Sequence, residues 1–122
     1  MTVAGLVVAG AVGAVLRYLG DRFVQTRTGS DFPLGTLVIN VSGALVLGFL
    51  TGAALHHGLA EAWVTVLGTG LIGAYTTFST FTFDTFRLAR GDSPVAAVAN
   101  VTVSVAAGLG AAFAGLALGA LV

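Results

Sequence analysis

Cysteine and lysine are both absent from this 122-residue chain, and charged residues of either sign make up only 8% of it. Without cysteine, disulfides, thiol catalysis and cysteine-ligated metal sites are excluded. The five arginines are matched by five acidic residues, which leaves no basic field for nucleic acid. A water-soluble domain carries about 25% charged residues. The hydrophobic share of 57% therefore places this chain in a lipid bilayer.

Long uncharged stretches alternate with short charged ones along the chain. A helix of about 20 apolar residues crosses the roughly 30 Å hydrocarbon core of a bilayer. Ser93 or Asp92 is expected to cap the last such helix, with Pro94 in its first turn. We predict a single all-α domain of residues 1–122 with four membrane spans, near residues 2–20, 33–55, 62–87 and 94–121.

All five arginines fall in or beside the two loops that join the first span to the second and the third to the fourth. The positive-inside rule predicts that these loops are cytoplasmic and that both termini lie outside. Arg17 stands four residues before Asp21, and its role is either that of an interfacial anchor or ion pair, or that of a positively charged vestibule for an anion. We expect Asp84 and Arg87 to form an ordinary pair at a helix end.

Glycine is abundant, with 18 residues that mostly lie within the spans. Gly48 with Gly52, and Gly115 with Gly119, have the small-xxx-small spacing that lets membrane helices approach closely. The pattern predicts a tight bundle. Because 122 residues are too few to enclose a pore, we also expect an oligomer.

The third span is unusual because three glycines precede a dense run of Ser, Thr and Phe. Gly and β-branched Thr weaken the helix near Gly73–Thr77, and a break in the membrane is tolerated where the freed backbone groups are buried or meet an ion. Phe78 and Phe81 share one face of this segment. The intramembrane amides of Asn40 and Asn100 should face the bundle interior, either as pore lining or as contacts between helices.

Three ordered motifs, at residues 13–18 (GAVLRY), 33–43 (PLGTLVINVSG) and 73–81 (GAYTTFSTF), resemble those of the Fluc (CrcB) fluoride-specific channels. The likeness extends over essentially the whole chain. Two positions depart from the pattern: Asn100 stands where a tyrosine is expected, and Asp84 where glutamate is common.

The resemblance implies an antiparallel dimer of four-helix subunits, with fluoride pathways at the interface and a broken third helix. It also implies a structural sodium ion, held at the dimer centre by the backbone carbonyls of Gly73 and Thr76. The side chains expected along the fluoride pathway are Phe78, Phe81, Asn40, Ser79, Thr80 and Ser104.

The function implied is passive fluoride efflux through the cell membrane, and the alternative is a non-conducting helper subunit of a heterodimeric channel. An antiparallel homodimer needs subunits that insert both ways, so the arginine bias favours a heterodimer over a homodimer. A proton-coupled exporter is disfavoured because residues 1–16 contain no acid. No nucleophile, base and acid can be assembled from the few loop histidines and acids, so an enzyme is not expected.

Overall fold

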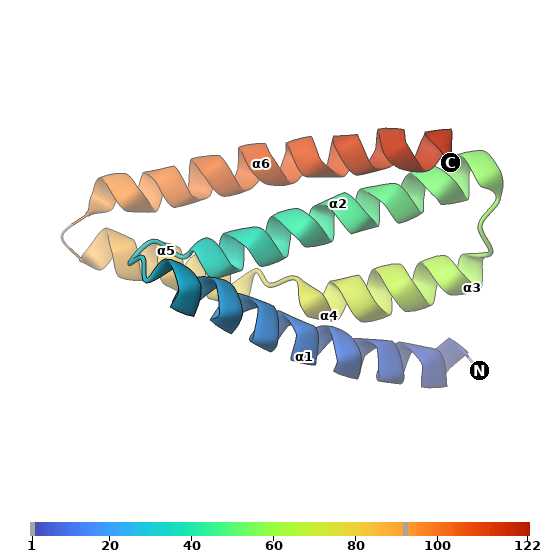
Figure 1. Cartoon of the computed structure of the whole chain (residues 1–122), viewed down its shortest axis with the longest axis horizontal. Helices are drawn as coiled ribbons and strands as arrows, with labels where there is room; N and C mark the ends of the chain where they lie inside the picture. Colours follow the sequence, from blue (N-terminus) through green and yellow to red (C-terminus); the bar gives the residue numbers. More distant parts are fainter. Residues whose placement is uncertain (1, 92) are drawn as a thin grey trace.

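The computed structural model describes residues 2–91 and 93–122, and these form an elongated bundle of helices with no strand among them (Figure 1). Three helices are long and apolar enough to cross a membrane, and the fourth pass is divided into shorter segments. In chain order the elements are α1 (Thr2–Thr28), α2 (Leu34–His57), α3 (Glu61–Trp63), the π-helix η1 (Val64–Ile72), α4 (Gly73–Tyr75), α5 (Ser79–Arg90) and α6 (Pro94–Leu121).

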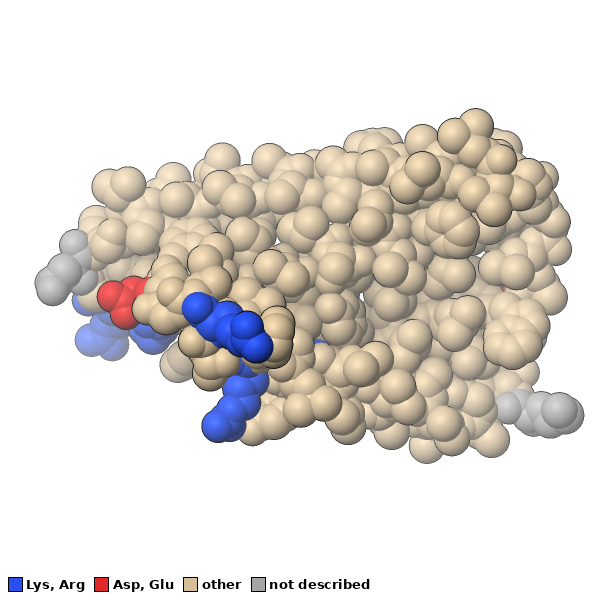
Figure 2. Space-filling view, in the orientation of Figure 1, with Lys and Arg blue, Asp and Glu red and all other residues tan. Residues whose placement is uncertain are grey.

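The two ends of the chain lie at the same end of the bundle (Figure 1). Arginine side chains gather at the opposite end, around the α1–α2 and α5–α6 connections (Figure 2). The four passes and the separation of charge thus agree with the sequence prediction. The assignment of the arginine-rich end to the cytoplasm stays a prediction.

Helix boundaries follow the turn residues, and the largest difference from the predicted spans is in the first helix. α1 continues to Thr28, well past residue 20, because no proline interrupts it and the turn residues begin only at Gly29. Gly29 adopts a left-handed φ of 58° and its N–H donates to the Gln25 carbonyl, which ends the helix. At the start of α6, the Ser93 hydroxyl accepts a hydrogen bond from the Ala96 N–H at 3.3 Å. Asp92, the other predicted cap, lies outside the described residues.

The tightest helix crossing joins α2 to α6. A Cβ atom added to Gly48 would collide with the Ala112 carbonyl of α6, and one added to Gly115 would collide with the Leu45 carbonyl of α2. Gly52 and Gly119 are in equally close backbone contact. The two predicted small-xxx-small pairs are therefore confirmed, and they face one another.

The first half of the third pass packs against α1 and is wound as a π-helix, which the sequence did not predict. Within this segment, the Gly68 carbonyl accepts a hydrogen bond from the N–H of Gly73, five residues further along the chain. Gly13 of α1 lies against the Leu71 carbonyl, and Gly70 lies against Ala9, so the wider turn is held by close backbone contact. Hydrophobic spacing does not distinguish this winding from an α-helix.

Candidate ion pathway

The third pass breaks between α4 and α5, in the middle of the bundle (Figure 1). Thr76 adopts an extended conformation with ψ of 161°, after its N–H has made a last helical bond to the Ile72 carbonyl. Helix α5 resumes at Ser79, which leaves residues 76–78 without helical structure. The predicted break near Gly73–Thr77 is confirmed and lies at the C-terminal side of that window.

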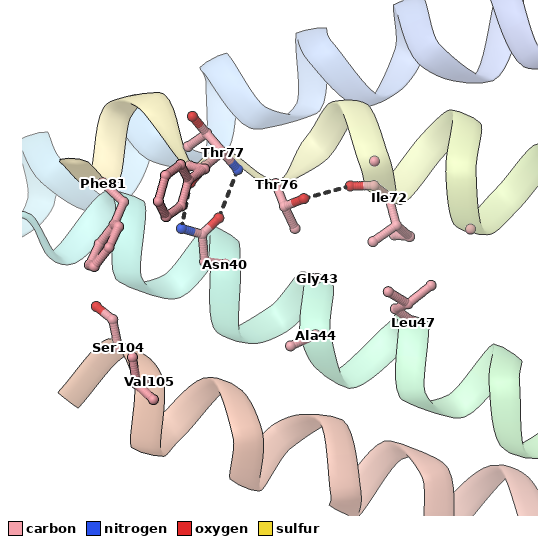
Figure 3. Close-up of a pocket in the computed structure, with 13 residues that line it drawn as sticks. Asn40, Gly43, Ala44, Leu47, Ile72, Thr76, Thr77, Phe81, Ser104 and Val105 are labelled. Carbon is pink, nitrogen blue, oxygen red and sulfur yellow. Dashed lines mark hydrogen bonds between the residues drawn. The ribbon is translucent and has the colours of Figure 1, made fainter. Parts of the chain in front are cut away.

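Asn40 of α2 replaces the backbone partners that Thr77 loses at the break. Its Nδ2 atom donates to the Thr77 carbonyl at 2.8 Å, and its Oδ1 atom accepts from the Thr77 N–H at 2.8 Å (Figure 3). The N–H and the C=O of one residue are paired here by a side-chain amide, as they would be by a neighbouring strand. We call this pair of bonds the Asn40–Thr77 clamp. Gly43, one turn along α2, makes room for the Thr76 side chain, because a Cβ there would overlap Thr76 Cγ2.

The break also frees carbonyl oxygens. Within the described chain, no backbone N–H donates to the carbonyl of Gly73 or of Thr76. The Thr76 carbonyl lies 3.4 Å from Nη1 of Arg17, which donates to it. Carbonyls of unwound membrane helices are the groups that coordinate sodium in other proteins. The carbonyl oxygens of the two residues predicted to hold sodium are therefore ligands of the type that this ion binds.

A groove of about 440 Å³ runs along the break, between α2, the third pass and α6 (Figure 3). Its lining is mainly apolar and includes four polar side chains, those of Asn40, Thr76, Thr77 and Ser104. Gly73, Phe78 and Phe81 line it as well. In Figure 3 the ring of Phe81 on α5 points toward Ser104 on α6. The structure thus brings most of the predicted pathway residues to one surface.

The two phenylalanine rings lie together but differ in exposure. Their centroids are 6.0 Å apart with an interplanar angle of 43°. Phe78 is 76% exposed, whereas Phe81 is half-buried.

The hydroxyl side chains at the start of α5 form a cluster of their own. Thr77 Oγ1 donates to Thr80 Oγ1 at 3.1 Å and lies 3.4 Å from Ser79 Oγ. It also accepts from the Thr80 N–H at 3.2 Å, which closes the first turn of α5. Ser79 and Thr80 are exposed and do not line the groove. Thr80 lines a second cavity, of about 190 Å³, with Arg17.

Arg17 lies on α1 beside this second cavity and is half-buried. Asp21 lines the same cavity, but within the described residues no Arg17–Asp21 pair falls within 4.0 Å. The ion pair, one of the roles left open for Arg17, is therefore not formed, and the guanidinium reaches across to the Thr76 carbonyl instead. The predicted pair of Arg87 and Asp84 is present at 3.7 Å.

Two features of the site were missed at the sequence level. The Tyr75 hydroxyl lies 2.9 Å from Ser42 Oγ, which ties α4 to α2 just before the break. Asn100 is 2% exposed and donates to Thr85, so it links α6 to α5 behind the groove. Asn100 was expected to face the interior, and its burial confirms that. The spacing of residues in the sequence did not indicate that Thr85 is its partner.

Comparison with known proteins places this architecture in a family. The family described as "CrcB-like protein, Camphor Resistance (CrcB)" matches residues 4–116. A Streptomyces avermitilis protein named "Fluoride-specific ion channel FluC 1" is 56% identical over 112 residues, covering 91% of this chain and 90% of the relative. The "FluC 1" protein of Frankia casuarinae is 50% identical over 93% of this chain and 92% of its own length. A Mycobacterium tuberculosis protein, "Fluoride-specific ion channel FluC 2", is 48% identical over 91% and 85%. This four-pass, broken-helix membrane chain belongs to the CrcB family.

Proposed function

We propose that the chain is a subunit of a fluoride-specific channel that lowers cytoplasmic fluoride by passive efflux. The names of its relatives support this, since all three are called fluoride-specific ion channels. The structural observation that carries the proposal is the clamped helix break, which places polar groups and two phenyl rings on an open groove. A subunit that only packed against others would gain nothing from such a break.

Fluoride is small and strongly hydrated, so its pathway must replace lost water with close donors that do not trap the ion. The Asn40 amide has two N–H hydrogens, of which Thr77 takes one. The other hydrogen and the Ser104 hydroxyl are the remaining donors on the groove, because the hydroxyls of Thr76 and Thr77 donate to the Ile72 carbonyl and to Thr80 Oγ1. The edges of the Phe78 and Phe81 rings carry partial positive charge and add a weak, dry attraction for an anion. Ser79 and Thr80 would act at the start of α5, outside the groove.

Gly73 and Thr76 would hold a structural sodium ion through their backbone carbonyls. When bound, the cation supplies positive charge near the membrane centre and lowers the cost of an anion there. Within the described residues, no group of three acidic or histidine side chains offers another cation site. Arg17 adds a second positive charge beside Thr76, in the cavity that it shares with Thr80. This position suits a vestibule role better than an interfacial ion pair.

The groove needs a second subunit to become a closed pathway. The Phe78 ring is 76% exposed and the groove is open along one side, in a chain with too few residues to fold over it. An antiparallel partner would cover it. The arginine bias fixes one direction of insertion for this chain, so we infer a related partner of opposite orientation, in preference to a second copy.

Efflux follows from charge and membrane potential. Neutral hydrogen fluoride crosses the bilayer, ionises at cytoplasmic pH and is trapped as the anion. With the interior negative, an open anion pathway favours outward flow by about 2.3 kcal/mol per 100 mV. No energy source beyond this potential is required.

Fluoride efflux from liposomes tests the proposal. The chain is purified alone and co-expressed with a related subunit, and each preparation is reconstituted with internal fluoride. We expect fluoride release and no chloride release from at least one preparation. Absence of fluoride release from both would refute the proposal. If only the pair conducts, and altering Phe81 of this chain leaves flux intact, the chain is the helper subunit instead.

A further inference from the structure

The hydroxyl of Ser104 is held differently from most helical hydroxyls in this chain. Those of Thr51, Thr82 and Thr85 each donate to the backbone carbonyl four residues earlier, as Ser and Thr in helices commonly do. Ser104 Oγ instead donates to the side-chain oxygen of Asn100, one turn back, at 3.5 Å. Its hydroxyl is therefore kept away from the backbone of its own helix.

Asn100 is fixed at its other end. The side chain is 2% exposed, and Nδ2 donates to Thr85 Oγ1 at 2.9 Å. The Thr85 hydroxyl in turn donates to the Phe81 carbonyl at 2.8 Å. These bonds form one directed relay from Ser104 through Asn100 and Thr85 to Phe81. The relay joins two groove residues, and its longest link is the one at Ser104.

A long, neutral hydrogen bond is easily exchanged for a better one. Hydrogen bonds to an ion are roughly twice as strong as neutral ones. An anion in the groove beside Ser104 would therefore take the hydroxyl hydrogen from Asn100, while Thr85 keeps the Asn100 amide in place. Without Asn100, the Ser104 hydroxyl would turn to the carbonyl of its own helix and be lost as a donor.

We propose that Asn100 is a positioning residue for the ion pathway: its buried side-chain oxygen holds the Ser104 hydroxyl ready and releases it to fluoride. The proposal rests on the fluoride-channel function inferred above. It assigns a role to a side chain that is fully covered by protein and does not itself line the groove.

The test compares fluoride efflux at low and high fluoride in the preparation that conducts, chain alone or chain with partner. We expect Asn100→Leu to lower the rate about tenfold at low fluoride and much less at high fluoride, because a donor of the pathway is weakened. Ser104→Ala should show the same pattern. Combining the two changes should lower the rate by less than twofold beyond Ser104→Ala, because both remove the same donor.

Variants at Thr85 distinguish a loss of Asn100 positioning from a general disruption of folding. Thr85→Val removes the anchor of Asn100 and should shift the low-fluoride rate like Asn100→Leu, whereas Thr85→Ser keeps the hydroxyl and should restore it. Thr51→Val removes a hydroxyl that bonds only to the Leu47 carbonyl, and should leave the rate unchanged at both concentrations.

Two results would overturn the proposal while leaving the channel function intact. One is an equal loss for Asn100→Leu with and without the Ser104 hydroxyl. The other is a proportional loss at both fluoride concentrations, which would indicate fewer folded channels. Lack of flux from the unaltered protein would instead refute the channel function itself.

Discussion

Replacing Asn40 by leucine tests whether the Asn40–Thr77 clamp holds the break. The change keeps the branched four-atom shape of the side chain and removes both 2.8 Å bonds to the Thr77 backbone. A polar group left without its partner in a buried site costs about 1–3 kcal/mol. Two such groups give a loss of about 2–6 kcal/mol, and half-burial of Thr77 favours the lower end. At about 1.4 kcal/mol per factor of ten, the folded fraction falls at least about 25-fold relative to the unfolded.

The loss of stability is measured by heating the purified protein in detergent and monitoring its unfolding by size-exclusion chromatography. Asn40→Asp is a more specific test, because the side chain keeps nearly the same shape and loses only its N–H donors. It keeps an acceptor for the Thr77 N–H but places an oxygen against the Thr77 carbonyl, so it too should destabilise. Ser104→Ala is the matched control, because it removes a groove hydroxyl without touching the clamp and should lower flux with little change in stability. Wild-type unfolding and flux for Asn40→Leu would refute the clamp.

Three further outcomes are expected. Phe81→Ile should abolish fluoride flux without unfolding the protein, since the ring edge is lost from the groove. The control Phe86→Ile, on the same helix but outside the groove, should conduct normally. Retained flux in Phe81→Ile would exclude the ring from the pathway. Gly115→Ala should destabilise the protein by about 1–3 kcal/mol by overpacking the α2–α6 crossing. The control Gly110→Ala should be neutral, because a Cβ atom there would meet no other atom within 4 Å. Equal unfolding temperatures for the two variants would contradict the close contact. Removing sodium from both sides should lower flux or dissociate the subunits, and indifference to sodium would argue against a cation at Gly73 and Thr76.

The membrane class, the four passes and the break could all be predicted from sequence, because each depends on local composition. Runs without charge set the passes, and glycine with threonine weakened the third one. The close-packing role of the Gly48–Gly52 and Gly115–Gly119 pairs was also accessible, since small residues at this spacing have few uses beyond close packing. These features need no knowledge of which helix neighbours which.

Side-chain partners across helices could not be predicted in the same way. Asn40 was expected beside the phenylalanines, but its pairing with the Thr77 backbone depends on how α2 passes the break. For Arg17, an ion pair with Asp21, four residues along the same helix, was one of the alternatives left open, and the structure shows a bond to the Thr76 carbonyl instead. A carbonyl freed by the break competes with the neighbouring carboxylate, and only the three-dimensional arrangement shows which of them the guanidinium reaches.

The clamp has a consequence for how this sequence can vary. Asn40 recognises only the main chain of Thr77, so the clamp itself does not depend on which side chain residue 77 carries. The hydroxyl at that position is left to the cluster with Ser79 and Thr80. The main chain of Thr77 thus holds the bend, while its hydroxyl also accepts from the Thr80 N–H at the start of α5. A serine at position 77 would keep both interactions, whereas a side chain without a hydroxyl would keep the clamp and lose the bond that closes the first turn of α5.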